Sequence, residues 1–479
     1  MALEPEGASS APPRSSFWWR GALGAALLAL LVTGVHRTTR SPEETRSAAA
    51  ARAEVEALWA AKAAHLSGWR TEPGGRPSGG LVLSLRRLVA LDPKDRNRQR
   101  ALLIVQAALG DAGWRSTADG LGSAAGAAGI DARGERALWI EAFGGPPPSA
   151  ERAREIVASL ERMRLGWYRL VAREIVYTRA SMGAEARDAR QLATRWFWRL
   201  MPLAALMLGA AVWGMGLLAL ALFAMATKRL RPSLRWMLTN SAPGRLDRRR
   251  ADVLYATFLI YLLAFLTAKL VGPLALPLLG DPPSVRAQHA ASVTLMVLVT
   301  VAPLLAYRRF CRQHGMGAEH LGLRKRPWLP EALWGVAAYC ATLPLVIGAT
   351  LLSAWVFDEQ ASPLHPIVTE MAVLADPIVM LLLAFQAVVL APIVEELMFR
   401  GAFFGGVAPR IGAIGAIIVT SAAFALMHPQ LPVGFAGLFL LGASMCGLYA
   451  VRGSIVGPIV FHGVNNGVAF LLLWALSAT

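Results

Sequence analysis

Long apolar segments dominate the chain after residue 200 and constrain its fold more than any other feature. Each approaches the roughly 20 apolar residues that a helix needs to cross a bilayer. The sequence therefore predicts an all-α, polytopic protein of the cell membrane with about eight or nine transmembrane helices. The candidate spans are residues 17–35, 200–226, 253–279, 290–307, 330–357, 377–403, 411–428, 433–451 and 455–476.

Composition supports a membrane protein rather than a soluble one. Hydrophobic residues make up 55% of the chain and charged residues only 16%. The formal net charge of +17 would suggest nucleic acid as a partner of a soluble protein, but the basic residues cluster in short loops at 227–251 and 308–328. Because cytoplasmic loops of membrane proteins are enriched in Lys and Arg, we expect both loops on the cytoplasmic side, a lipid environment and no nucleic-acid partner.

Cysteine usage points to neither a disulfide framework nor a thiolate metal site. The three cysteines, Cys311, Cys340 and Cys446, are far apart in the sequence and show no paired spacing.

The chain before residue 200 changes character twice. Residues 1–16 are rich in Pro and Ser and are predicted to be disordered. The apolar segment 17–35 is interpreted as a signal anchor rather than a cleaved signal peptide, because the small residues at 48–51 lie far beyond it. Residues 36–194 are predicted to form a helical extramembrane domain outside the cytoplasm, and residues 195–328 membrane helices with basic cytoplasmic loops.

Helical patterns recur through residues 36–194. Apolar residues are spaced for helices at 55–59, at 102–109 and on one amphipathic run from Ile156 to Leu170. Gly- and Pro-rich breaks at 73–80 and 144–148 separate these patterns.

Three charged residues interrupt the apolar run that begins near Pro377. A charge at the centre of a membrane helix costs about 2.5–3.5 kcal/mol on insertion scales, so such residues usually pair or perform a function. Glu396 and Arg400 are four residues apart and are expected to pair along one helix face, which leaves Glu395 as the candidate general base. In the alternative interpretation, all three charges form a solvated helix end at the membrane surface.

Two further polar clusters lie in the apolar segments that follow. His428 ends the segment after Phe424, and His462 and Asn466 share one face of the last segment, whereas Asn465 points elsewhere. Taken singly, a histidine before a proline suggests a helix end, and a His/Asn pair suggests interhelical hydrogen bonds. Taken together with Glu395, these groups are the set expected for hydrolysis by an activated water.

These motifs, EExxxR, FxxxH and HxxxN in this order, resemble those of the CPBP intramembrane proteases. That family contains the type II CAAX prenyl endopeptidases and the related bacteriocin-processing or immunity proteins (Abi). The resemblance runs from Pro392 to Asn466 and implies a catalytic membrane domain within residues 329–479. It does not extend to residues 36–194.

The resemblance implies a role for each motif residue. Glu395 and His428 would activate a water for attack on a peptide carbonyl, and His462 and Asn466 would bind the oxyanion. Glu396 and Arg400 would hold the helix.

The resemblance leaves metal dependence open. Glu395, His428 and His462 could supply three ligands to zinc or another divalent metal. However, no HExxH motif is present, and we expect no tightly bound metal.

The sequence thus predicts an intramembrane endopeptidase that cleaves a membrane-bound or membrane-proximal peptide or protein substrate. The alternative is a non-catalytic immunity or scaffold protein that binds a peptide or partner with the same fold. A small-solute transporter is a third hypothesis, disfavoured because the two halves of the chain show no matching pair of Gly/Pro-broken spans.

One geometric difficulty accompanies this prediction. If residues 377–403 and 411–428 cross the membrane in opposite directions, Glu395 lies in the inner half and His428 near the outer face. At about 1.5 Å of rise per residue, the two would be roughly 20 Å apart. They could share a water only if one of the helices is tilted, broken or partly inserted.

Overall fold

All regular structure in the described part of the chain is helical. The computed structural model describes residues 42–69, 79–123, 132–163, 165–227, 246–275, 284–324, 327–357, 376–428 and 430–477. The predicted first membrane segment, 17–35, lies outside these residues, as does most of the basic loop 227–251.

The chain divides into two compact units. The first, here called the N-terminal unit, contains the described residues from Pro42 to Met207 and those from Leu471 to Ser477. The second, here called the membrane unit, contains the described residues from Leu208 to Phe357 and from Asp376 to Phe470.

The N-terminal unit is a set of helices around an apolar core. Leu103, Trp139 and Ile156 are among the residues that this core buries completely or almost so. The predicted amphipathic run from Ile156 to Leu170 is two helices rather than one, because the chain turns between them at Gly166, which has a positive φ of 53°. The helices are α2 (Pro42–Leu66), α3 (Gly79–Leu91), α4 (Arg96–Ala108), α5 (Trp114–Ser123), α6 (Ala132–Phe143), α7 (Ala150–Glu161), α8 (Tyr168–Arg179) and α9 (Gly183–Ala226), and α9 continues past the end of the unit.

A buried ion cluster joins α4 to α6 in this unit. Glu135 is fully buried and accepts hydrogen bonds from Arg100 Nε at 2.7 Å, Arg96 Nη2 at 2.6 Å and Trp139 Nε1 at 3.2 Å. Burial alone would raise the pKa of this carboxyl, but the hydrogen bonds outweigh it and lower the pKa to about 2. The cluster therefore holds a charged carboxylate inside the helical core.

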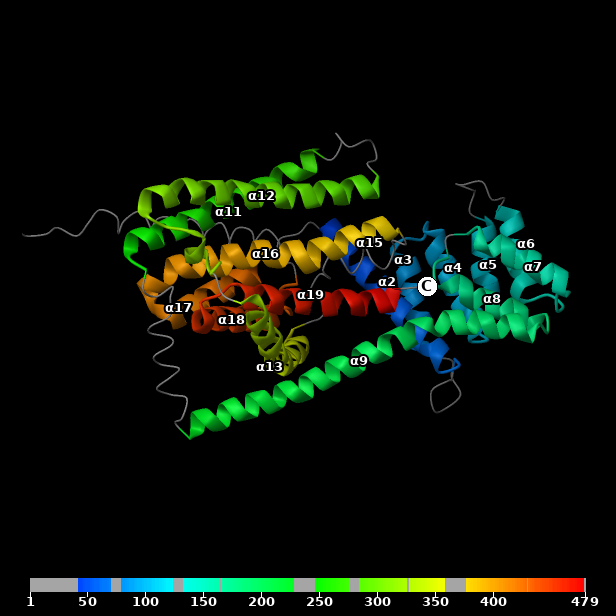
Figure 1. Cartoon of the computed structure of the whole chain (residues 1–479). Helices are drawn as coiled ribbons and strands as arrows, with labels where there is room; N and C mark the ends of the chain where they lie inside the picture. Colours follow the sequence, from blue (N-terminus) through cyan, green and yellow to red (C-terminus); the bar gives the residue numbers. More distant parts are fainter. Residues whose placement is uncertain are drawn as a thin grey trace, which may run out of the picture. The chain divides into compact units, whose positions relative to one another are not determined.

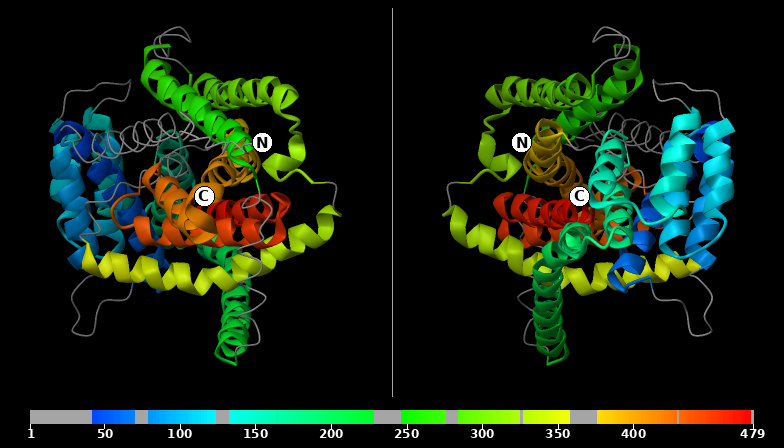
Figure 2. Two further views of the ribbon diagram at one scale, coloured as in Figure 1. Left: turned by 90° about the vertical axis from the view of Figure 1, so that its left-hand side faces the viewer. Right: turned by 90° about the vertical axis from the view of Figure 1, so that its right-hand side faces the viewer.

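The membrane unit contains the remaining helices, and within it α11 and α12 pack against each other as a pair (Figures 1 and 2). Two stretches, η5 and η6, are π-helical and interrupt one long continuous helix. The helices are α11 (Arg248–Ala275), α12 (Val285–His314), α13 (Trp328–Val356), α15 (Pro377–Ala384), η5 (Phe385–Leu390), α16 (Ala391–Glu396), η6 (Leu397–Phe404), α17 (Gly405–Leu426), α18 (Phe435–Arg452) and α19 (Val456–Ser477), with the short 3-10 helix η3 (Ala318–Leu321) before α13.

Seven helices in the described residues are long and apolar enough to cross a membrane. The chain is therefore an integral membrane protein. One of the seven runs from Pro377 to Leu426, and its 50 residues exceed what a single crossing needs. This helix covers two of the nine predicted spans, 377–403 and 411–428, and a third, 17–35, lies outside the described residues, which together account for the count of seven.

The long helix reverses direction at Gly412. This residue has φ 77° and ψ 165°, a combination that interrupts the helix inside α17. Phe399 and Phe424, almost equidistant in sequence from Gly412, have ring centroids 5.4 Å apart, so the segments on either side lie antiparallel. Figure 1 shows α17 folding back beside the helix that precedes it.

The position of this reversal resolves the geometric difficulty found in the sequence. The helix before the reversal continues about two turns beyond residue 403. The part of α17 after Gly412 therefore extends back to the level of Glu396. Arg410 pairs with Asp252 of α11 and donates to the Gly406 carbonyl next to the turn. The predicted spans placed the turn between residues 403 and 411, whereas the helix continues to Gly412.

Replacing Gly412 with alanine is expected to destabilise the membrane unit. The φ and ψ of this residue lie in a region that is essentially restricted to glycine, and a side chain there costs on the order of 1–3 kcal/mol. Nothing lies within 4 Å of the added Cβ, so the effect would be conformational rather than steric. Thermal unfolding in detergent should show a midpoint lower by a few degrees.

Gly348→Ala on α13 is the matched control, because its Cβ also meets nothing within 4 Å and its φ is not positive. An equal loss in both variants would contradict the reversal as described.

Candidate active site

The π-helical stretches bracket the segment that carries the two glutamates. At the end of η5, the Ala391 N–H donates to the Gln386 carbonyl five residues back. The same five-residue spacing would pair the Ala387 carbonyl with the N–H of residue 392. That residue is Pro392, which has no N–H to donate. Asn466 of α19 fills this place, because its Nδ2 donates to the Ala387 oxygen at 2.8 Å.

Two glycines allow α19 to lie close to η5. A Cβ on Gly463 would come within 3.0 Å of the Val388 carbonyl oxygen, and one on Gly467 within 3.5 Å of the Val388 side chain. Small residues spaced four apart permit such close approach of membrane helices. The GVNNG sequence therefore places Asn466 within reach of the opposite backbone.

Glu396 is the most extensively bonded acid of the cluster. Its side chain is fully buried, and its Oε1 accepts from Arg400 Nη1 at 2.8 Å and from His462 Nδ1 at 2.9 Å. The pairing with Arg400 confirms the expectation from the four-residue spacing. The bond to His462 was not predicted, since nothing in the sequence indicates which carboxylate faces α19.

The aromatic ring of Phe424 lies at the centre of the cluster. Its centroid is 4.6 Å from that of His428, 5.8 Å from that of His462 and 4.6 Å from the Arg400 guanidinium carbon. Both imidazoles and the arginine thus contact one buried ring, although they come from different parts of the chain. The sequence marked Phe424 only as the start of FxxxH and gave no sign of this central position.

The hydrogen bonds of the two histidines fix where their Nδ1 protons lie. His428 Nδ1 is 2.7 Å from the Phe424 carbonyl oxygen, and His462 Nδ1 is 2.9 Å from the Glu396 carboxylate. Both partners are acceptors, so both Nδ1 atoms carry a proton. The Nδ1 of each histidine is therefore engaged in holding its ring in place.

Glu395 differs from Glu396 in its exposure and its hydrogen bonding. Its side chain is partly exposed and makes no hydrogen bond to any residue that the structure describes. It interacts electrostatically with His462, Glu396 and Arg400. No direct hydrogen bond joins Glu395 to His428, so a joint action of these two groups would need a water between them.

Asn466 keeps capacity for a further hydrogen bond. One N–H of its amide goes to the Ala387 carbonyl, and its Oδ1 accepts from Asn465 Nδ2 at 3.2 Å. A primary amide has two N–H donors, so one is left over. Asn465, expected to point elsewhere, contributes by holding this amide.

The predicted ligand set does not fit a metal centre. Within the described ranges, no three His, Cys, Asp or Glu side chains are grouped closely enough to hold an ion. We therefore derive no step through a metal.

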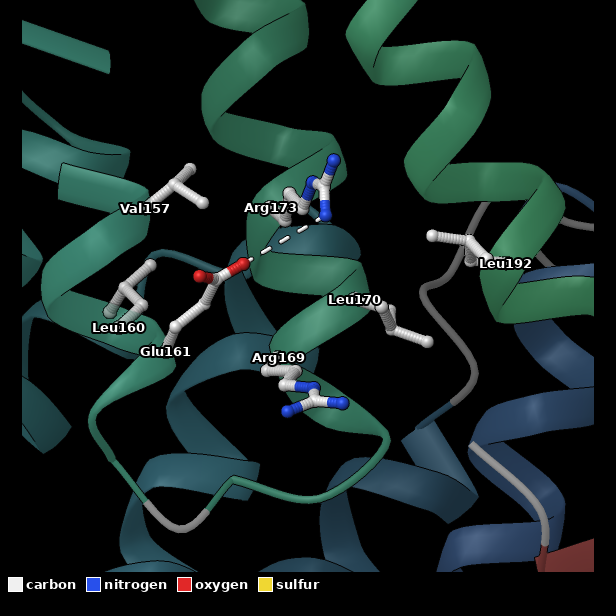
Figure 3. A pocket seen from close by; sticks show the side chains of 7 residues that line it. All are labelled: Val157, Leu160, Glu161, Arg169, Leu170, Arg173 and Leu192. Carbon is white, nitrogen blue, oxygen red and sulfur yellow. Dashed lines mark ion pairs between the residues drawn. The ribbon is translucent and has the colours of Figure 1, made fainter. Parts of the chain in front are cut away.

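A hollow lies within the N-terminal unit. Its volume is about 430 Å³, and Figure 3 shows the side chains that line it. Arg173 and Glu161 form an ion pair at its edge, with 3.8 Å between Nη1 and Oε1. None of the predicted site residues lies there. The lining consists of Val157, Leu160, Glu161, Arg169, Leu170, Arg173 and Leu192.

Comparison with known families identifies the part of the chain that carries the polar cluster. Residues 377–468 match the family model described as type II CAAX prenyl endopeptidase Rce1-like. This segment is an Rce1-like domain. No curated protein and no solved structure shows significant similarity to the chain.

All six predicted site residues fall within the Rce1-like domain, from Glu395 to Asn466. The N-terminal unit and helices α11 to α13 lie outside the matched segment.

Arg400→Met is expected to destabilise the Rce1-like domain strongly. It would leave the buried Glu396 carboxylate without its cation, and breaking a buried ion pair typically costs about 3–5 kcal/mol. The double variant Glu396→Gln/Arg400→Met removes both charges and should lose less stability than Arg400→Met alone. Unfolding of the purified protein in detergent measures both effects, and purely additive losses would contradict the pairing.

Proposed function

We propose that the Rce1-like domain is an intramembrane endopeptidase that hydrolyses a membrane-bound or membrane-proximal peptide. The observation that carries the proposal is the gathering of His428, His462 and Arg400 around the Phe424 ring beside the two glutamates. A base, two imidazoles and an amide donor are the groups that amide hydrolysis by water requires.

Glu395 is the proposed general base. Its carboxylate has no hydrogen bond among the described residues, so it is available to take a proton from water. His428, whose Nδ1 bonds to the Phe424 carbonyl, is the proposed second group that would hold the same water. The water oxygen attacks the peptide carbonyl carbon, and the proton taken by Glu395 passes to the amine nitrogen when the C–N bond breaks.

His462 and Asn466 are the proposed oxyanion donors. Asn466 offers its remaining amide N–H. His462 can donate from Nε2 only as an imidazolium, because its other N–H already faces Glu396. The Glu396 carboxylate would stabilise that cation as the negative charge develops on the carbonyl oxygen.

The charges of this arrangement balance. Two ionised glutamates, Glu395 and Glu396, face two cations, Arg400 and a protonated His462. A neutral total reduces the cost of holding ionised groups at membrane depth. Glu396 and Arg400 are thus proposed to support the site rather than to touch the substrate.

Glu395→Gln is expected to lower peptide cleavage by about 10²–10⁴-fold, the range that general acid–base catalysis contributes. The volume and packing of the side chain are conserved, so stability should change little. The measurement is the turnover of prenylated and unprenylated membrane peptides by the purified full-length chain, with products identified by mass spectrometry. Glu319→Gln, which changes an exposed carboxylate of η3, is the matched control.

Undiminished cleavage by Glu395→Gln would overturn the mechanism. Absence of cleavage by the unmodified protein, together with retained peptide binding, would favour the non-catalytic immunity or scaffold function.

Cleavage is expected to survive removal of divalent metals. No group of three metal-binding side chains is present in the part of the chain that the structure describes, and the proposed base acts on water directly. The test compares turnover before and after dialysis against a chelator, with metal content determined by mass spectrometry. A loss of activity that added zinc restores would contradict this prediction.

A further inference from the structure

Helix α11 lies outside the matched segment but runs alongside the helix that carries the two glutamates. The residue numbers of its contact partners decrease as its own residue numbers increase. Tyr255 lies 6.2 Å from Phe403 between ring centroids, and Phe258 lies 5.4 Å from Phe399. The two helices are therefore antiparallel.

The close approach of two glycines to α11 gives the same register. A Cβ on Gly406 would meet the Tyr255 nitrogen at 2.8 Å, and one on Gly405 would meet the Leu254 side chain at 2.9 Å. The stacked rings of Phe258 and Phe403, with centroids 4.2 Å apart, fix the alignment.

Extending this register by one helical turn brings Tyr261 level with Glu395. Residues three apart on a helix lie on the same face, so Tyr261 continues the face that carries Phe258. Its side chain interacts electrostatically with Glu395, as expected from this alignment. Tyr261 is only 3% exposed, and its ring lies between Phe258 and Phe265, with centroids 6.3 and 6.2 Å away.

The carboxylate of Glu395 lacks the hydrogen-bond donors that hold the carboxylate of Glu396. Glu396 is held by Arg400 and His462, whereas Glu395 makes no hydrogen bond among the residues that the structure describes. A general base works best when its carboxylate has one orientation. A phenol hydroxyl at the same level supplies a donor for that purpose.

We propose that Tyr261 is a positioning residue of the site, whose hydroxyl orients the Glu395 carboxylate through a bridging water. This inference rests on the proposed function for its catalytic consequence, but the contact itself is independent of activity. It adds α11, a helix outside the Rce1-like match, to the groups that build the site.

The kinetic test is Tyr261→Phe, which keeps the ring packing and removes only the hydroxyl. The expected result is a fall in kcat of about 10- to 100-fold, the range that one hydrogen bond to a charged group accounts for, with KM within about twofold. Tyr255→Phe is the matched control on the same helix, because the Tyr255 hydroxyl is buried and has no hydrogen-bond partner in the described structure. That control should retain full kcat.

The second test needs no cleavage. Infrared difference spectra of the full-length protein identify the carboxyl band of Glu395 as the one lost in Glu395→Gln. Tyr261→Phe should shift this band, and Tyr255→Phe should leave it unchanged. An unshifted band in Tyr261→Phe overturns the proposal, and so does a kcat equal to that of the Tyr255→Phe control.

The two readouts separate failure of this inference from failure of the proposed function. A protein that does not cleave but shows the band shift retains the Tyr261–Glu395 interaction without a protease activity. A protein that cleaves and shows neither effect has a protease site that does not depend on α11.

Discussion

The bifurcated hydrogen bond to Glu396 is the interaction on which the rest of the Rce1-like domain depends. One carboxylate oxygen receives both the Arg400 guanidinium, from one turn along the same helix, and the His462 imidazole, from α19. Ionised groups are costly at membrane depth, so the three residues stabilise the fold only together. Arg400 extends the connection to α18 through the Gly442 carbonyl at 3.3 Å.

The reversal at Gly412 brings further site residues to the level of the Glu396 interaction. Because the helix continues to Gly412 before it turns, the returning arm brings Phe424 to the level of Arg400. The aromatic ring of Phe424 then contacts both His428 and His462. An earlier turn, as the apolar pattern suggests, would have left these groups at different depths.

The sequence predicted much of the fold and part of the site, and the limits have physical causes. Apolar length identifies membrane helices, because every buried backbone group in lipid must be bonded within its helix. Helical spacing predicted the Glu396–Arg400 pair, which is local. It could not predict the bond from His462 to Glu396 or the register of Tyr261, because contacts between helices depend on packing that no short pattern encodes. The π-helical stretches, which alter the register, were also missed.

The missing N–H of Pro392 has a consequence for how this chain can vary. The Ala387 carbonyl is open to Asn466 because the residue at 392 cannot donate to it. A residue with an N–H at position 392 would compete with Asn466 for the Ala387 oxygen. The side-chain amide of Asn466 would then lose the hydrogen bond that holds it in place. The two positions, far apart in sequence, are therefore energetically coupled, and the effect of replacing either one depends on which residue occupies the other.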